Sequence, residues 1–221
     1  MAKDDGVIGR IKDKLVESKQ RWAREGRLLT GKADAAHQQR LPPGQREVKN
    51  WPVLDLGVQP EIARAEWRLS VDGLVANPLS WSWEEFIAQP QVEDVSDIHC
   101  VTAWSRYDNR WRGVAATHLL ALVGPLPAAR HVICHSHDGY TTNLRLEAFA
   151  GDDVLLAHEW EGKPIPAEHG GPVRVVVPKL YFWKSAKWIR RIELSAEDKP
   201  GFWEVRGYHN EADPWQEERY S

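Results

Sequence analysis

The sequence predicts an α+β protein built from mixed or antiparallel β-sheets and short helices. Segments with the alternating or apolar pattern of strands outnumber segments with helical periodicity, and the helical segments are brief. Strands and helices do not alternate regularly along the chain, which argues against a parallel βαβ fold. The chain also lacks an internal repeat and the glycine spacing of a Rossmann or P-loop phosphate site.

The chain is predicted to consist of an N-terminal arm with a linker, residues 1–44, and one main domain, residues 45–221. Residues 7–28 carry apolar positions among many charges and are interpreted as a docking helix. The linker, residues 31–44, ends in Pro42-Pro43-Gly44, a combination that interrupts regular structure. With 221 residues, of which 42% are hydrophobic, the chain has enough material for one large core.

The first predicted strands of the domain are separated by a turn. Residues 67–71 alternate between apolar and polar side chains and stop at Asp72-Gly73, a turn signal. Residues 79–81 resume the strand pattern, and Ser82 is placed to cap a short helix that runs to Ile87. We therefore expect two strands followed directly by a helix.

The second half of the domain is predicted to contain mainly strands. Residues 95–104 are expected to form a strand that runs into a loop. Thr117 is predicted to cap a helix over residues 119–123, which Gly124 ends. Asp138-Gly139 predicts a hairpin turn. The other expected strands are short and cover residues 131–137, 140–146, 154–157, 173–177 and 188–194.

Composition and charge exclude several classes of protein. A net charge of −3 provides no general attraction to nucleic acid. Two cysteines cannot form the disulfide framework of a small secreted domain. The charged N-terminus lacks a signal-peptide pattern, and no apolar run approaches the length of a membrane span. We therefore expect a cytoplasmic protein without a transmembrane segment, acting as a monomer.

Cys100 is the first candidate for chemistry. It lies in the stretch Asp-Ile-His-Cys-Val-Thr-Ala-Trp. A lone buried cysteine is more often a small hydrophobic residue than a reactive one. Here polar neighbours and Arg106 follow closely in the sequence, and cations favour the thiolate, which is the metal-binding form. From the residues alone, the inert and the functional interpretations are evenly balanced.

A second candidate group is the run His131-Val-Ile-Cys134-His135-Ser136-His137. In a strand the three histidines share one face and Cys134 takes the other. Three imidazoles can bind zinc, but a row of side chains along one strand does not converge on one tetrahedral ion without ligands from elsewhere. Hydrogen-bonded histidines are therefore favoured, with a zinc site as the minor alternative.

Two further segments together predict an anion-binding pocket. In His169-Gly-Gly-Pro-Val-Arg174, the glycines are expected to let the backbone approach a ligand and to turn N–H groups toward an anion. Arg174 should point away from its valine neighbours and leave its fork free for a phosphate. The run from Lys184 to Lys187 adds two ammonium groups and a hydroxyl. Each segment alone is better explained as a polar turn, whereas both together indicate a phosphorylated cofactor.

In this order, these residues resemble the molybdopterin-binding domain of the sulfite oxidase family, over roughly residues 45–215. The chain is most similar to the bacterial branch that contains the methionine-sulfoxide reductase catalytic subunit, and within it to the shorter cytoplasmic members. The resemblance implies a sulfite-oxidase-type fold and a molybdenum–molybdopterin (Mo-MPT) cofactor. It also implies a small-molecule substrate and a separate electron donor or acceptor.

The resemblance assigns roles residue by residue. Cys100 matches the single protein ligand of molybdenum, Tyr208 matches a tyrosine that lies near the metal, and Arg106 is the one arginine available for an anionic substrate. The other matched positions would bind the cofactor: Asn50, Trp51, Leu54, Asp55, either His135 or Ser136, His169, Arg174, Lys184, Ser185, Ala186 and Lys187.

The sequence departs from sulfite oxidases directly after the cysteine. Those enzymes have an arginine-rich run there, whereas this chain reads Val-Thr-Ala-Trp-Ser before Arg106. The resemblance therefore implies oxygen-atom or two-electron transfer on a sulfoxide, an N-oxide or a sulfite-like compound, without identifying which. Trp104 and Trp111 are predicted to shape access or to belong to the core. The alternative function is a non-catalytic domain that binds or carries the cofactor.

Overall fold

The structure is a computed structural model that describes residue 14, residues 16–18, 20–21 and 40–221. The predicted arm helix and linker lie mostly outside these residues. The described positions between residues 14 and 21 are helical. Within the described part of the chain, no helix is both long and apolar enough to cross a membrane.

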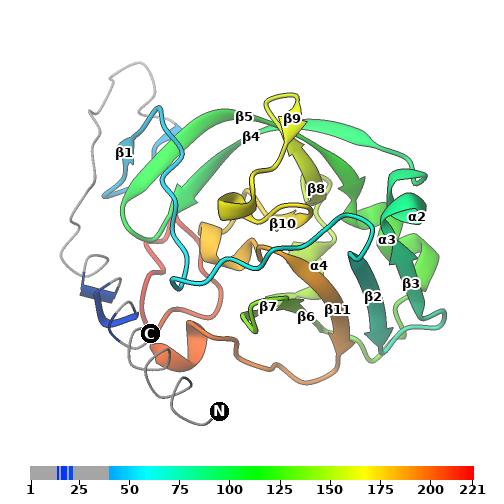
Figure 1. Cartoon of the computed structure of the whole chain (residues 1–221). Coiled ribbons are helices and arrows are strands. Elements are labelled where there is room, and N and C mark those ends of the chain that lie inside the picture. Colours follow the sequence, from blue (N-terminus) through cyan, green and yellow to red (C-terminus); the bar gives the residue numbers. More distant parts are fainter. Residues whose placement is uncertain (1–13, 15, 19, 22–39) are drawn as a thin grey trace, which may run out of the picture.

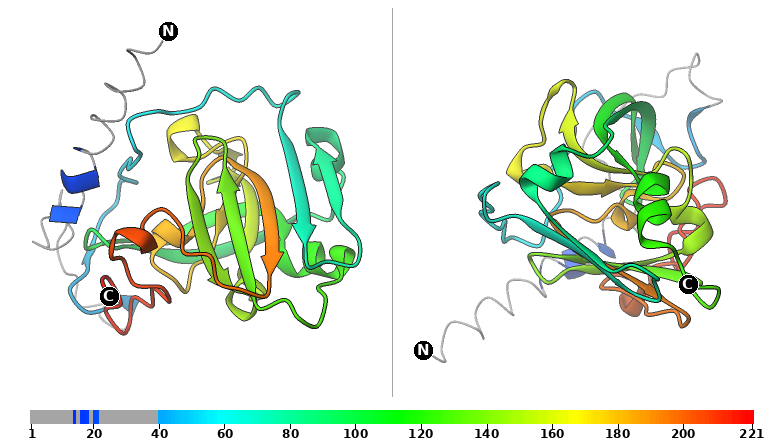
Figure 2. Two further views of the ribbon diagram at one scale, coloured as in Figure 1. Left: turned by 90° about the horizontal axis from the view of Figure 1, so that it is seen from below. Right: turned by 90° about the vertical axis from the view of Figure 1, so that its right-hand side faces the viewer.

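Two β-sheets form the framework of the described chain (Figures 1 and 2). The first contains β1 Arg46–Glu47, β4 Val92–Cys100, β5 Trp104–Ala115, β8 Leu155–Trp160, β9 Lys163–Pro164 and β10 Arg174–Val176. Its order is β1-β5-β8-β10, with β4 paired to β5 and β9 to β8. The second has the order β3-β2-β11-β6-β7, with β2 Arg68–Gly73, β3 Leu79–Ser82, β6 His131–Ser136, β7 Thr141–Arg145 and β11 Ile189–Ser195.

Both sheets are mixed, because β1 runs parallel to β5 and β2 runs parallel to β11, while the other pairs are antiparallel. The helical elements are short: α2 Trp83–Ile87, α3 Ala116–Val123, α4 Leu146–Phe149, and the 3-10 turns η2 Ala167–His169, η3 Phe182–Lys184 and η4 Glu204–Arg206. The predicted α+β class with mixed sheets and brief helices is confirmed.

The ends of α2 and α3 show whether the helix caps predicted from the sequence are formed. The Ser82 hydroxyl accepts a hydrogen bond from the Glu85 N–H, and the Glu85 carboxylate accepts one from the Ser82 N–H, so the predicted cap of α2 is confirmed. Gly124 ends α3 in a left-handed conformation, also as predicted. The prediction for Thr117 was wrong. The N-cap of α3 is Ala115, which has no side-chain cap, and Thr117 lies inside the helix.

Strand β5 is the main element that the sequence analysis missed, because residues 104–115 were not recognised as a strand. Its buried positions include Ser105, Asn109 and Gly113, which interrupt the apolar alternation that marks a half-buried strand. Gly113 is required there: a Cβ would lie 2.1 Å from the Leu156 carbonyl oxygen of the neighbouring β8.

Two hydrophobic clusters lie on opposite faces of β8 and β10. Successive strand residues point to opposite faces, so Leu156 and Val175 join the first cluster, whereas Leu155 and Val176 join the second. The first cluster fills the space between the two sheets. The segment between β1 and β2, cyan in Figure 1, crosses the molecule and brings Trp51 into the second cluster. The candidate site lies in this second cluster.

Candidate cofactor site

Beside the second cluster lies an open cavity of about 840 Å³, a volume that includes its solvent-filled mouth, and its walls come from distant parts of the chain. These parts are the segment before β2, the turn after β4, the turn after β6, the loops around β10 and η3, and the segment around η4. The lining residues are Trp51, Pro52, Leu54, Asp55, Leu56, Cys100, Val101, Thr102, Trp104, Ser136, Asp138, Tyr140, His169, Arg174, Phe182, Trp183, Ser185, Lys187, Trp188, Trp203 and Tyr208.

Most of the residues predicted from the sequence meet at this cavity. Those that line it are Trp51, Leu54, Asp55, Cys100, Ser136, His169, Arg174, Ser185, Lys187 and Tyr208. Those that do not line it are Asn50, Arg106, His135, Lys184 and Ala186. The structure therefore unites the cysteine with the predicted anion-binding segments, although they are separated by some seventy residues in the sequence.

Arg174 faces the cavity because strand alternation places it opposite its valine neighbours, as predicted. Its side chain is 1% exposed, and it donates hydrogen bonds to the carbonyl oxygens of His169, at 2.7 Å, and Ser185, at 2.8 Å. The guanidinium carbon lies 4.1 Å from the centre of the Phe182 ring. No carboxylate pairs with it among the described residues, and burial lowers its pKa to about 9. An enclosed cation held only by carbonyl groups is suited to an anionic ligand.

His169 lies beside this cation with one ring nitrogen available. Its ring stacks on Trp51, with centroids 3.8 Å apart and an interplanar angle of 7°. Burial, followed by the charges of Arg174 and Lys187, lowers the pKa of His169 to about 3. The imidazole is therefore neutral near pH 7, and its buried Nδ1 has no hydrogen-bond partner in the described part of the chain.

Lys187 joins two walls of the cavity. Its Nζ donates to the carbonyl oxygens of Leu54, at 2.8 Å, and Glu168, at 2.6 Å. Nearby, the Ser185 hydroxyl accepts a hydrogen bond from the Val177 N–H, which links the residue after η3 to the residue after β10. The segment that contains Trp51 is thus tied to the loop that contains His169.

The two glycines after His169 serve chain packing. Gly170 has φ +103°, and a Cβ there would lie 2.8 Å from Lys187 Cβ, while a Cβ on Gly171 would lie 2.1 Å from the Ile165 carbonyl oxygen. Both glycine N–H groups donate to backbone carbonyls, Gly170 to Ala167 and Gly171 to Pro166. The prediction that these N–H groups turn toward an anion was therefore wrong.

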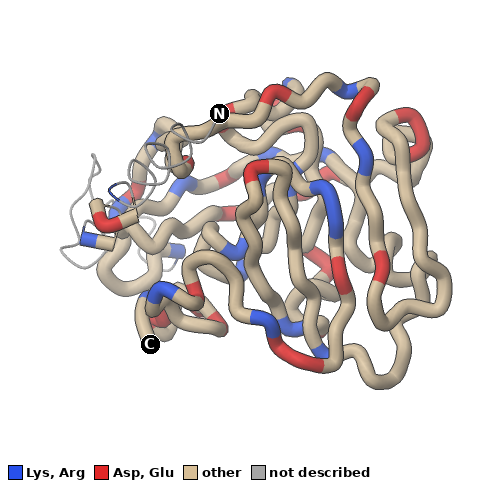
Figure 3. Tube along the Cα trace, turned by 60° about the horizontal axis from the view of Figure 1, so that its bottom comes forward, with Lys and Arg blue, Asp and Glu red and all other residues tan. Residues whose placement is uncertain are grey.

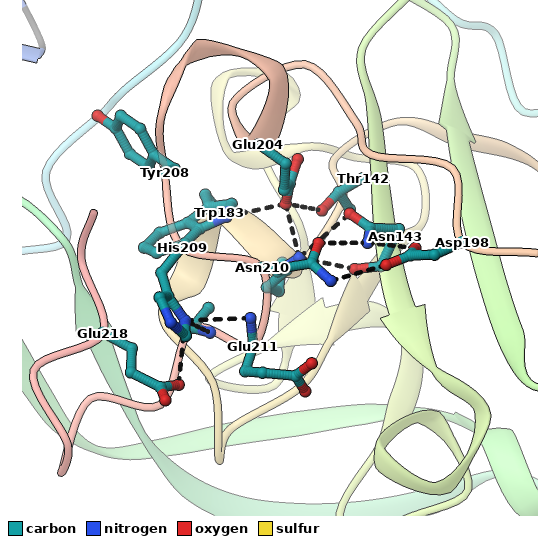
Figure 4. Close-up of polar contacts among 12 residues, drawn as sticks. Thr142, Asn143, Trp183, Asp198, Glu204, Tyr208, His209, Asn210, Glu211 and Glu218 are labelled. Carbon is teal, nitrogen blue, oxygen red and sulfur yellow. Dashed lines mark hydrogen bonds and ion pairs between the residues drawn. The ribbon is translucent and has the colours of Figure 1, made fainter. Parts of the chain in front are cut away.

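Lys184, predicted to contact the cofactor, instead forms a buried ion pair behind the cavity wall. Its Nζ lies 2.7 Å from Glu204 Oε1, and the two side chains are 0% and 2% exposed. The same carboxylate oxygen accepts hydrogen bonds from Thr142 Oγ1 and Trp183 Nε1 (Figure 4). Because Trp183 lines the cavity, this ion pair holds one of its aromatic walls in position.

Arg106 also lies away from the cavity. It donates to the Lys49 carbonyl oxygen, contacts Asn109 and Glu161, and places its guanidinium carbon 4.7 Å from the centre of the Trp160 ring. These contacts hold the side chain on the β5 surface, where it does not reach the lining. The structure thus offers no support for the predicted contact between Arg106 and substrate.

Of the remaining residues predicted to contact the cofactor, only Ser136 lines the cavity; the others lie on another face or are exposed to solvent. His135 bonds to Glu193, with 3.2 Å between Nε2 and Oε2, whereas the next residue, Ser136, lines the cavity. Ala186 belongs to the first hydrophobic cluster, and Asn50 is exposed. The zinc alternative also lacks support: no group of three or more histidine, cysteine or acidic residues placed to bind a metal occurs in the described ranges.

The turn that carries Cys100 accepts hydrogen bonds from residues near the start and near the end of the domain. Cys100 ends β4 and is 6% exposed, and its carbonyl oxygen accepts hydrogen bonds from the N–H of Ala103 and from Gln45 Nε2, each at 3.0 Å. Arg219 Nη1 donates to the Val101 carbonyl oxygen at 2.7 Å. Sequence reasoning missed Gln45 and Arg219, because nothing in their local sequence indicates that they meet this turn.

Aromatic side chains complete the wall around Tyr208. Its ring stacks on Trp203, with centroids 4.8 Å apart, and meets Trp183 edge-on at 5.0 Å. Of the two tryptophans predicted to shape access or to pack in the core, Trp104 lines the cavity, whereas Trp111 packs beneath Trp51 at 5.3 Å. Sequence reasoning did not single out Trp183 or Trp203, since twelve tryptophans are too many to rank without a fold.

The donors and acceptors at the cavity fit a large polar cofactor with a phosphate and a metal. Three buried polar atoms on its lining residues have no partner within the described chain: Trp104 Nε1, Ser136 Oγ and His169 Nδ1. The enclosed Arg174 suits the phosphate, and the Cys100 thiol is a soft ligand for a metal. Together with the fold, these groups define the protein as one that binds a large phosphorylated cofactor with a metal.

Comparison with known proteins identifies the cofactor. A family described as the oxidoreductase molybdopterin binding domain matches residues 56–203, so the chain belongs to this family. It is 46% identical over 183 residues to the uncharacterized oxidoreductase YuiH of Bacillus subtilis strain 168, covering 82% of this chain and 92% of that protein. The chain is therefore a molybdopterin-binding oxidoreductase with Mo-MPT as its cofactor.

Two more distant relatives are named as methionine-sulfoxide reductase subunits. The putative protein-methionine-sulfoxide reductase subunit YedZ1 of Azospira oryzae is 32% identical over 67% of this chain and 56% of its own length. The protein-methionine-sulfoxide reductase catalytic subunit MsrP of Gluconobacter oxydans is 31% identical over 62% of this chain and 49% of its own length. The chain thus spans about half of each of these two proteins.

A solved structure confirms the fold. The sulfane dehydrogenase SoxCD from Paracoccus pantotrophus superposes with a TM-score of 0.59 at 21% identity, covering 76% of this chain and 56% of that one. This likeness and the family match together confirm the predicted sulfite-oxidase-type fold, and the family match confirms the predicted family.

His169 is expected to make the stability of the cofactor-free protein depend on pH. Its pKa falls from about 6.5 in the unfolded chain to about 3 in the folded one. The unfolded chain therefore binds an extra proton between these values, so the contribution of His169 is fully present above pH 6.5 and is lost as the pH falls toward 3.

Urea unfolding of the wild type and of His169→Gln at pH 7, 6 and 5 measures this contribution. Relative to the variant, the wild type should lose about 1 kcal/mol of unfolding free energy per pH unit below pH 6. Parallel pH profiles for the two proteins would contradict the expectation. Taking the difference removes the effect of other histidines with lowered pKa values, such as His135 and His158.

Proposed function

We propose that this chain reduces small, uncharged S-oxides or N-oxides, using an external electron donor. The charge of the cavity lining carries this proposal. The lining contains two cations, Arg174 and Lys187, and two acidic residues, Asp55 and Asp138. No other arginine or lysine lines the cavity within the described chain. A cofactor phosphate would use these cations, which leaves none for an anionic substrate such as sulfite.

The residues of the chain divide the work between binding and positioning. In this assignment Cys100 holds the metal, while Arg174, His169, Lys187 and Ser185 hold the phosphate. The contacts to the pterin come from Trp51, Leu54, Asp55 and Ser136. When bound, the cofactor would supply the oxygen-atom and two-electron transfer chemistry.

On the substrate side, Tyr208 supplies a buried hydroxyl donor for the oxygen atom, and the rings of Trp183 and Trp203 contact the apolar groups. Reduction of a sulfoxide consumes two electrons and two protons and releases a thioether and water. The names of the YedZ1 and MsrP relatives support a sulfoxide as the substrate. Their substrate is only a proposal for this chain, which spans about half of each of them.

Turnover with a panel of substrates tests the proposal. Metal-loaded protein with a reduced viologen dye should reduce a dialkyl sulfoxide or a tertiary amine N-oxide with kcat/KM at least about tenfold above that for nitrate. The reason is that an anionic substrate finds no further cation on the described cavity lining with which to form a charge-assisted hydrogen bond. Sulfite oxidation, followed with ferricyanide, should be similarly poor.

Efficient turnover of sulfite or nitrate would overturn the assignment. Metal and pterin analysis of the same sample provides the control, since the absence of molybdenum would make the assay uninformative about specificity. A fully loaded protein that turns over none of these compounds would instead favour the non-catalytic binding domain.

A further inference from the structure

We propose that Thr102 tunes the metal site by donating a hydrogen bond to the Cys100 thiolate. This inference rests on the proposed function, in which Cys100 is the metal ligand. Thr102 Oγ1 lies 3.1 Å from Cys100 Sγ. The sulfur is the hydrogen-bond partner that the described residues provide for this buried hydroxyl, and both side chains line the cavity.

Metal binding determines the direction of this hydrogen bond. A free thiol and a hydroxyl can each act as the donor. A metal-bound cysteine is a thiolate and has no proton to donate. The Thr102 O–H must then point to the sulfur, which makes the contact a charge-assisted hydrogen bond.

The surrounding turn keeps the hydroxyl in this place. Thr102 is 7% exposed, and its β-branched side chain has few accessible rotamers. The turn around it is closed by the hydrogen bond from the Ala103 N–H to the Cys100 carbonyl, and it is fixed from outside by Gln45 and Arg219. The contact is therefore formed before any cofactor binds, and ordering it requires little further loss of freedom.

A hydrogen bond to a ligand sulfur changes the electronic properties of the metal. The donor withdraws electron density from the thiolate, so the sulfur donates less to the metal and the reduced state becomes more favourable. The filled sulfur orbitals are lowered in energy as well, which raises the energy of the thiolate-to-metal charge-transfer absorption. Removal of the hydroxyl should reverse both effects.

Four variants separate the hydroxyl from the shape of the side chain. Thr102→Val keeps the shape and removes the hydroxyl, Thr102→Ala removes both, and Thr102→Ser keeps the hydroxyl. Thr117→Val is the matched control, because Thr117 is exposed on α3. The measurements are the visible absorption and an anaerobic redox titration of the cofactor-loaded protein.

In the Val and Ala variants we expect the charge-transfer band to move to lower energy and the midpoint potential to fall. The ratio of oxidised to reduced metal at a given potential should change about tenfold, or about 59 mV for one electron. The Ser variant and the Thr117 control should match the wild type. If Thr102→Val does not retain metal, the difference in band energy and midpoint potential between Thr102→Ala and Thr102→Ser tests the role of the hydroxyl.

Three results would overturn the inference: a Val variant equal to the wild type, a shift in Ala without one in Val, or a shift in Ser as large as in Val. Cys100→Ser identifies the source of a failure. If its charge-transfer band disappears, the ligand assignment stands and only the role of Thr102 is refuted. If the band persists, the proposed ligand itself is refuted.

Discussion

Replacement of Cys100 by serine is expected to abolish turnover, with a loss of at least about a hundredfold. The thiolate-to-metal absorption should disappear as well, because a serine oxygen is a harder ligand than a thiolate and has no sulfur orbital from which charge can transfer to the metal. The fold should persist, since serine occupies slightly less space in the turn between β4 and β5 and keeps its backbone hydrogen bonds to Gln45 and Ala103.

The chain provides a matched control in its second cysteine. Cys134 lies in the first hydrophobic cluster, away from the cavity lining, and burial raises its pKa to about 12. Cys134→Ala should therefore leave the absorption and the rate per bound metal unchanged, apart from a small loss of stability. Normal turnover in Cys100→Ser, or equal losses in the two variants, would refute the ligand assignment.

Arg174→Ala is expected to lower cofactor occupancy at least about tenfold while leaving the substrate preference of the loaded fraction unchanged. The change removes a cation that the cavity encloses, and it leaves the His169 and Ser185 carbonyl oxygens without their donors. Molybdenum and pterin per protein chain are the measurement, after circular dichroism has shown that the variant is folded.

Two further variants determine which property of Arg174 matters. Arg174→Lys keeps a positive charge but cannot form both hydrogen bonds in the same fork geometry, so intermediate occupancy is expected. Arg112→Ala removes an exposed arginine that pairs with Glu159 on the β5 surface, and it should retain full occupancy. Wild-type occupancy in Arg174→Ala would exclude a role for this residue in holding the phosphate.

The predictions were correct for features that depend on neighbouring residues and failed for features that depend on residues distant in the sequence. Signals within a few residues were sufficient for the helix cap at Ser82, the helix end at Gly124 and the hairpin turn at Asp138-Gly139. Strand β5 was missed because its buried face contains Ser105 and Asn109, whose polarity is satisfied only in the folded protein. The Asn109 side chain, for example, donates to the carbonyl oxygens of Ser96 and Arg106.

The same limit applies to the candidate site. Alternation along a strand correctly predicted that Arg174 would oppose its valine neighbours, and the family resemblance selected Cys100, His169 and Ser185. It did not predict that Lys184 would pair with Glu204 behind the wall or that Arg106 would stay on the β5 surface. Those outcomes depend on partners twenty to fifty-five residues away, whose positions are set by sheet pairing.

The local sequence was thus sufficient to predict the α+β class and to propose candidate thiolate and anion-binding residues, and the resemblance to a known family predicted the molybdopterin family. It left the environment of each residue open. Only the tertiary structure showed that two cations and two acidic residues line the same cavity, that Gln45 and Arg219 hold the cysteine turn, and that Thr102 contacts its sulfur. The physical reason is that burial and hydrogen-bond pairing arise between segments distant in the chain, and these set the charge and specificity of a site.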